Sequence, residues 1–117
     1  MPRDSKPGSA FGRRLKEARA RLRISQKTLG IQAGLDEFVA STRINRYERG
    51  VHPPDGETAA LLAKALGVPR AYLYAENDRM ARLILAFDAL NAADQESVLK
   101  SVVAKQTRLG KTAVRGA

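Results

Sequence analysis

The stretch Ser25–Gly50, SQKTLGIQAGLDEFVASTRINRYERG, decides the fold of this chain. Ser25 is suited to cap a helix because its hydroxyl can accept a backbone N–H of the first turn. Leu29 and Ala33 then recur at helical spacing, as expected for one apolar face. Gly34 can end this helix, because the left-handed conformation costs glycine little. The first half of the stretch therefore predicts one short helix.

A second helical run fills the other half of the stretch. Ala40, Ile44 and Tyr47 are spaced four and three residues apart, which is the spacing of one helix face. Gly50 ends the run directly after Arg49. Two short helices joined by a glycine turn predict a helix-turn-helix, in which the second helix enters the major groove of DNA.

The same residues resemble the phage Cro/repressor-type, or XRE, family of helix-turn-helix transcriptional regulators. The resemblance is carried by Ser25-Gln26, Leu29, Ala33-Gly34, Ile44-Asn45 and Tyr47-Glu48-Arg49-Gly50. It covers residues 9–75 and implies an all-α fold, with a five-helix lambda-repressor-like DNA-binding domain. The function that it implies is sequence-specific regulation of transcription, by repression at an operator.

The connection between the two helices departs from the family pattern. Aligned from the YERG end, the extra residues are roughly 35–38. One interpretation is a longer loop with Phe38 tucked into the core. The other is that Asp36 caps a recognition helix lengthened by about one turn, since 3.6 residues make a turn.

Further helices are expected on both sides of this stretch, and with them the chain divides into four segments. The expected helices are Ser9–Arg23, Gly56–Leu66, Arg70–Tyr74, Asp78–Ala89 and Ala92–Thr107. In the first of them, Phe11, Leu15, Ala18 and Leu22 form one apolar stripe. We expect a disordered arm at 1–8, the DNA-binding domain at 9–75, a helical extension at 76–107 for dimerisation or partner binding, and a basic tail at 108–117.

Basic residues concentrate in two parts of the 117-residue chain. Residues 1–50 hold 12 Lys or Arg against 5 Asp or Glu, a net charge of +7, and residues 99–117 hold 5 against none. Residues 51–98 have a net charge of −3. Basic charge on a recognisable reader motif is typical of a surface that faces double-stranded DNA.

Several other classes of protein find no support in the sequence. The chain has no Cys, which excludes disulfides and thiolate metal sites. No apolar run approaches the ~18 residues of a membrane span, and the first residues lack the apolar region of a secretory signal. One His, no phosphate-binding glycine loop and no HExxH pair argue against an enzyme, a cofactor or a metal centre. We expect a soluble, cytoplasmic, non-enzymatic protein.

Alignment with the family assigns the residues that contact DNA. They are Gln26, Lys27, Ser41, Thr42, Arg43, Asn45, Arg46, Tyr47 and His52. Arg can bond guanine and Asn can bond adenine bidentately. Arg46 follows Ile44 by two residues, so it points roughly 200° away from that core residue, and we expect it to read a base or else to contact a phosphate at the groove edge. Arg13 and Arg14 are expected to touch only the DNA backbone.

Two remaining expectations concern an ion pair that stabilises the fold and the partners of the C-terminal extension. Arg19 and Glu48 match positions where the family has a buried ion pair. The extension suggests a homodimer on a near-palindromic site, with Leu83, Phe87, Leu99 and Val103 as candidates for the interface. The alternative function is an antitoxin that binds its own promoter and holds a toxin through the C-terminal helices.

Overall fold

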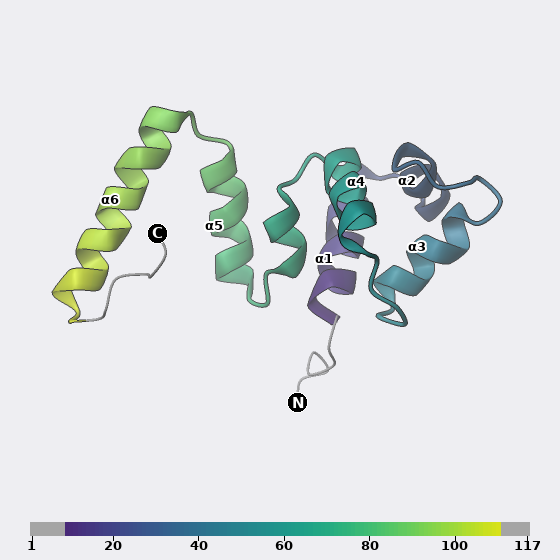
Figure 1. Ribbon diagram of the computed structural model, residues 1–117, viewed down its shortest axis with the longest axis horizontal. Coiled ribbons are helices and arrows are strands. Elements are labelled where there is room, and N and C mark those ends of the chain that lie inside the picture. Colours follow the sequence, from purple (N-terminus) through teal and green to yellow (C-terminus); the bar gives the residue numbers. More distant parts are fainter. Residues whose placement is uncertain (1–8, 111–117) are drawn as a thin grey trace. The chain divides into compact units, whose positions relative to one another are not determined.

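The computed structural model describes residues 9–110, and every regular element in this range is a helix (Figure 1). In chain order these are α1 (Ser9–Leu22), α2 (Gln26–Gln32), α3 (Ala40–Glu48), α4 (Gly56–Leu66), the 3₁₀ helix η2 (Arg70–Tyr74), α5 (Asp78–Asp88) and α6 (Ala92–Arg108). The expected all-α fold is confirmed. The arm expected at 1–8, and the tail from residue 111 onward, lie outside the described residues.

The chain forms two compact units that divide after Leu85. This division falls later than the boundary that we expected at residue 75. The reason is that Ala81 of α5 is buried in the core of the first unit, with Ile84 and Leu85 packed against it. The second unit starts inside α5 and includes all of α6.

The helix ends follow the capping residues of the sequence. The Ser25 hydroxyl accepts the Thr28 N–H at 2.9 Å, and the Asp55 carboxylate accepts the Thr58 N–H at 2.7 Å. Each cap satisfies a backbone donor that the helix itself cannot pair. Gly67 ends α4 with a φ of 72°, a conformation in which a Cβ would be strained. The cap expected at Ser25 is confirmed.

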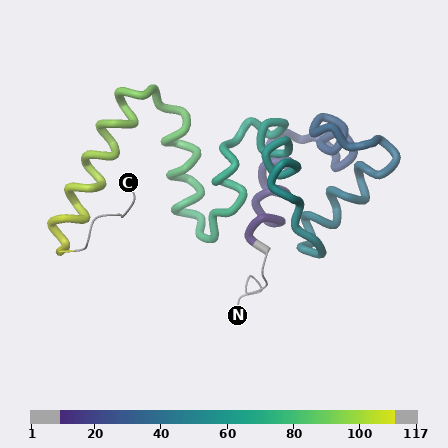
Figure 2. The backbone as a smooth tube through the Cα atoms, viewed as in Figure 1, coloured from purple at the N-terminus to yellow at the C-terminus, as the bar shows by residue number. Residues whose placement is uncertain are grey.

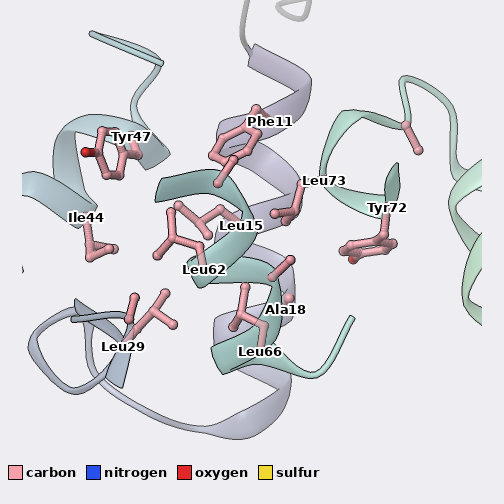
Figure 3. Packing of buried hydrophobic residues seen from close by; sticks show 14 of the residues in the cluster. Phe11, Leu15, Ala18, Leu29, Ile44, Tyr47, Leu62, Leu66, Tyr72 and Leu73 are labelled. Carbon is pink, nitrogen blue, oxygen red and sulfur yellow. The ribbon is translucent and has the colours of Figure 1, made fainter. Parts of the chain in front are cut away.

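One core joins α1, α2, α3, α4 and η2, and α5 adds Ala81 to it. Its largest fully buried side chains are Leu15, Leu29, Ile44, Leu62 and Leu73, one each from α1, α2, α3, α4 and η2. Figure 3 shows Leu15 and Leu62 in the middle of the cluster. No helix of this unit can therefore leave without exposing part of the same core. Leu22, expected on the stripe of α1, is instead half exposed in the last turn.

Arg14 is the clearest departure from expectation in α1. Its side chain is buried, and its Nε donates to the Ala75 carbonyl at 2.8 Å. Its Nη1 donates to Glu17 at 3.1 Å and to Asp78 at 3.0 Å. Burial lowers the pKa of Arg14, but the bonds to the two carboxylates outweigh it and leave the pKa raised. Our assignment of Arg14 to the DNA backbone is wrong, because its charge is used inside the fold.

The connection between α2 and α3 is a loop, as in the first of the two interpretations. Residues 33–39 form a loop that projects from the two helices in the view of Figure 2. The Asp36 carboxylate accepts the Phe38 N–H at 2.8 Å, so Asp36 caps a turn of the loop and does not lengthen α3. Phe38 is 88% exposed. The loop interpretation is right, and the expected burial of Phe38 is wrong.

Gly30 marks the closest approach of α2 and α3. A Cβ at Gly30 would lie 2.6 Å from the Cβ of Ala40 and 3.0 Å from its Cα. Contacts of this length are far inside van der Waals separation, so any side chain at residue 30 would push the two helices apart. The sequence accepts a poor helix former here because the helix-turn-helix needs this short separation.

Gly30→Ala is therefore expected to destabilise the protein, although alanine favours helix by ~1 kcal/mol over glycine. Overpacking against Ala40 should cost about 1–3 kcal/mol and outweigh that gain. Urea unfolding of Gly30→Ala and Gly56→Ala measures the difference. Gly56 is the control because a Cβ there would meet nothing within 4 Å. Equal stability of the two variants would contradict this close approach.

The second unit consists of the end of α5 and the whole of α6. Asn91 caps α6, because its side-chain oxygen accepts the Asp94 N–H at 2.8 Å. The Gln95 side chain donates to the Phe87 carbonyl at 2.8 Å, which fixes the turn between the two helices. No residue of α6 is buried. Across residues 9–110, no helix is long and apolar enough to cross a bilayer.

Candidate nucleic-acid interface

Helix α3 has one buried face and one exposed face. Ala40, Ile44 and Tyr47 are buried against the rest of the first unit. Because 3.6 residues make a turn, the side chains between these positions point away from the core. The exposed side chains are Ser41, Thr42, Arg43 and Arg46, and Asn45 is half-buried. The structure thus places all the candidate reader side chains of α3 on or beside its free surface.

Arg46 is an exposed cation on the outer face of α3. Its side chain is exposed, and within residues 9–110 it makes no hydrogen bond or ion pair. A guanidinium in this state keeps all five donors for an external partner. It is planar and can form two parallel bonds to a guanine edge or to a phosphate. The geometry therefore leaves Arg46 ready for either kind of contact.

The Arg43 side chain is bonded to Tyr47 on the same helix. Its Nη2 donates to the Tyr47 hydroxyl at 2.8 Å, and its guanidinium carbon lies 5.9 Å from the centre of the Tyr47 ring. This pair is one helical turn apart, so the contact follows from helix geometry. The Tyr47 hydroxyl accepts from Arg43 and keeps its own proton to donate. Together the two side chains present donors toward an anion.

A chain of hydrogen bonds links α3 to α1 and α2. Glu48 on α3 accepts from the Nε of Arg19 on α1 at 2.6 Å and from its Nη2 at 3.1 Å. The Glu48 side chain is 3% exposed and that of Arg19 is 16% exposed. The bond to Glu48 raises the pKa of Arg19, with burial acting in the opposite direction. The predicted buried ion pair is confirmed.

Gln26 extends this chain from α2 to the exposed face of α3. Its amide nitrogen donates to the Glu48 carboxylate at 3.0 Å and to the Asn45 side-chain oxygen at 3.3 Å. Both amide protons of Gln26 are then used inside the protein. Asn45 accepts this bond with one of the two lone pairs of its oxygen, and its amide protons are left for an external acceptor. In this arrangement Gln26 supports Asn45 and has no free proton for a phosphate.

A hollow of roughly 300 Å³ lies at the C-terminal end of α3. Its basic and hydroxyl-bearing lining residues are Arg43, Arg46, Tyr47, His52 and Thr58, with Asp55 as its acidic member. Bonds from the Thr58 backbone and side chain lower the pKa of Asp55, and the charge of Arg43 acts in the same direction. Asp55 is thus an ionised helix cap at the rim, and His52 is exposed beside it.

The remaining candidates lie on the surface of the helix-turn-helix. Lys27 is exposed in the first turn of α2, and Ser41 and Thr42 are exposed in the first turn of α3. Two residues in the same region were not among our candidates. Phe38 is exposed directly before α3, and Arg49 is exposed directly after it. The position of Arg49 in the YERG segment was a signal that could have been used to find it.

Comparison with known proteins agrees with this arrangement. A family model described as helix-turn-helix matches residues 15–73. A solved structure described as "Crystal structure of transcriptional regulator BswR" is 45% identical in sequence, with a TM-score of 0.71. The match covers 78% of this chain and 90% of that chain. The corresponding search of curated proteins gave no match. The chain belongs to the XRE-type helix-turn-helix family of DNA-binding transcriptional regulators.

Proposed function

We propose that this protein represses transcription by occupying a near-palindromic operator as a homodimer. The observation that carries the proposal is the state of Arg46, which is exposed on α3 with no internal partner in the described range. The opposite face of α3 is fixed by Ile44 and Glu48. A recognition helix whose buried face is fixed by packing, and whose exposed Arg46 has no partner among the described residues, can bind DNA in one defined register.

The exposed groups divide into readers and anchors. We assign base reading to Arg46, which has both the free donors and the outward direction for guanine. Asn45 keeps both amide protons and one lone pair of its oxygen, so it can still form the bidentate pattern of adenine while Gln26 holds its amide in place. Ser41 and Thr42, in the first turn of α3, are the remaining candidates for base contacts.

The anchors lie on both sides of α3. Arg43 with Tyr47, and His52 in the neighbouring loop, face the same hollow and suit one phosphate. Lys27 at the start of α2 suits a second phosphate. These contacts would fix position on the duplex without distinguishing sequences.

Selection of bound duplexes from random DNA by the purified protein tests the proposal. We expect one enriched motif made of two inverted half-sites with centres about 10 base pairs apart, because a two-fold dimer places its readers one DNA turn apart. Recovery of unrelated sequences at every round would contradict sequence-specific binding. A single unrepeated half-site would retain the reader and overturn the dimer.

The dimer is proposed from the second unit. Helix α6 has no buried residue, although Leu99, Val102 and Val103 lie on one side of it and are 40–48% exposed. An isolated helix gains little stability from its own backbone and needs tertiary packing of its apolar face. A second copy of the same helix would bury these side chains by a two-fold contact.

The double variant Leu99→Asp/Val103→Asp is expected to sediment as a monomer at concentrations where the natural sequence is a dimer. Its affinity for a single half-site should be unchanged, because neither residue belongs to the helix-turn-helix. Ser101→Asp is the matched control, since residue 101 lies roughly 200° around α6 from Leu99. A natural protein that is already monomeric at tens of micromolar would refute the dimer.

A pull-down for a tight protein partner, combined with sedimentation of the natural protein, separates the repressor from the antitoxin alternative. A monomer that copurifies with one tight, stoichiometric protein partner would favour an antitoxin, with α6 covered by the toxin. DNA binding alone would not separate them, because both can bind their own promoter. The cytoplasmic location follows from this proposal and stays a prediction.

A further inference from the structure

We propose that Phe38 is an apolar DNA contact that reads the methyl group of a thymine in the same half-site as the base pair recognised by Arg46. This inference rests on the proposed function and adds a specificity-determining residue to it. Phe38 is 88% exposed, the highest value among the large exposed hydrophobic side chains of the described residues. A phenyl ring held in water at this position loses the burial that a partner would restore.

The backbone around Phe38 is ordered by hydrogen bonds. The Leu35 N–H donates to the Gly30 carbonyl at 2.9 Å, and the Val39 N–H donates to the Asp36 carbonyl at 3.0 Å. The Phe38 N–H itself is held by the Asp36 carboxylate. Leu35 also packs against the core of the first unit. The ring is therefore presented from a fixed loop, which lowers the entropy lost when a partner binds.

The position of Phe38 favours the major groove over the DNA backbone. Val39 caps α3, so Phe38 lies within about 7 Å of the first turn of the helix, at ~3.5 Å per residue. Residues in and next to the first turn of a recognition helix lie near base edges. A phenyl ring has no donor to offer a phosphate oxygen, which disfavours a backbone contact for Phe38. The apolar group of the major groove is the thymine methyl, and Phe is among the residues that contact it.

The length of α3 sets the spacing between the two readers. Val39 and Arg46 are separated by about 10 Å along the helix axis, at 1.5 Å per residue. With base pairs about 3.4 Å apart along the duplex, this corresponds to on the order of three base pairs. We therefore expect a thymine about three pairs from the guanine read by Arg46, in each half-site.

Replacement of each operator thymine by deoxyuridine, one at a time, tests this directly because only the methyl group is lost. The natural protein should lose about fourfold in affinity at one thymine per half-site, the fold-change equivalent to ~0.8 kcal/mol for one apolar carbon. Phe38→Ala should bind the thymine and deoxyuridine duplexes equally. Glu37→Gln, the exposed neighbour, should keep the discrimination of the natural protein.

Four results would overturn the inference, and they differ in what else they affect. A natural protein that selects one motif but ignores every thymine methyl would remove the role of Phe38 and leave the proposed function standing. The same holds if Phe38→Ala keeps the discrimination, or if it becomes monomeric in sedimentation, which would make Phe38 a protein contact. A protein without preference for any duplex would end both proposals together.

Discussion

Glu48→Gln is expected to lower the free energy of unfolding by about 3–5 kcal/mol, because it removes one partner of a buried charge pair. Glu48 accepts three hydrogen bonds, two from Arg19 and one from Gln26. A glutamine amide would point a donor at one of these donors and leave the Arg19 charge without its counter-charge. Small domains have only about 5–15 kcal/mol in all, so this is a large share of the total.

Thermal and urea unfolding of Glu48→Gln measure this loss. At roughly 4–8 °C for each kcal/mol, the midpoint should fall by more than about 10 °C. Glu37→Gln serves as the control, since it makes the same chemical change at an exposed loop residue and should leave the midpoint in place. A midpoint of Glu48→Gln equal to that of the control would show that the pair contributes as little as a surface pair, under ~1 kcal/mol.

Arg46→Ala is expected to weaken operator binding by about 1–3 kcal/mol and to relax the preference at one base pair of each half-site. The loss should be specific to that pair because Arg46 has no internal partner in residues 9–110, so its removal leaves the fold unchanged. Duplexes that already lack the preferred base pair should bind the variant and the natural protein with similar affinity.

Lys27→Ala is the matched comparison for Arg46→Ala. Lys27 is exposed on α2, so its loss should weaken binding evenly over all sequences and flatten the salt dependence by about one unit of slope. Arg14, which we had expected to play this part, is unsuitable because its removal would disturb the core. If Arg46→Ala loses the same affinity on every variant duplex, Arg46 is an anchor, and the reader is Thr42, Arg43 or Asn45.

The parts of the fold that could be predicted are those determined by short sequence spacing. Caps such as Ser25 and Asp55 act within three residues, and glycine turns act within one. The Arg19–Glu48 pair is 29 residues apart in sequence, and no local rule would find it. It was predicted because the resemblance to the family supplied the long-range contact that spacing cannot.

The errors arose where tertiary contacts override local character. Arg14 lies three residues after Phe11 and four before Ala18, so it falls on the buried stripe of α1 despite its charge. It is buried because Asp78 and the Ala75 carbonyl, both distant in sequence, satisfy its guanidinium. The error for Phe38 is the opposite one. An aromatic residue suggests burial, but the loop holds this side chain in solvent.

The residues of the candidate DNA surface could be predicted from the sequence, but the pairing of their side chains could not. The sequence and the family resemblance give the residues of α3, yet only the structure shows that Arg43 is bonded to Tyr47 while Arg46 is free in the described range. It also shows that Gln26 donates both amide protons to groups within the protein, Asn45 and Glu48. Side-chain pairing of this kind depends on rotamers and on exposure, neither of which follows from spacing.

The most direct test of the central claim is the ratio of two dissociation constants at one salt concentration. One is for the duplex selected from random DNA, and the other is for a duplex of the same length and composition in permuted order. A reader on α3 predicts that the selected duplex binds at least about 10³-fold more tightly, the range of specific over non-specific binding. Equal constants for the two duplexes would show that only phosphates are contacted and would contradict sequence reading by α3.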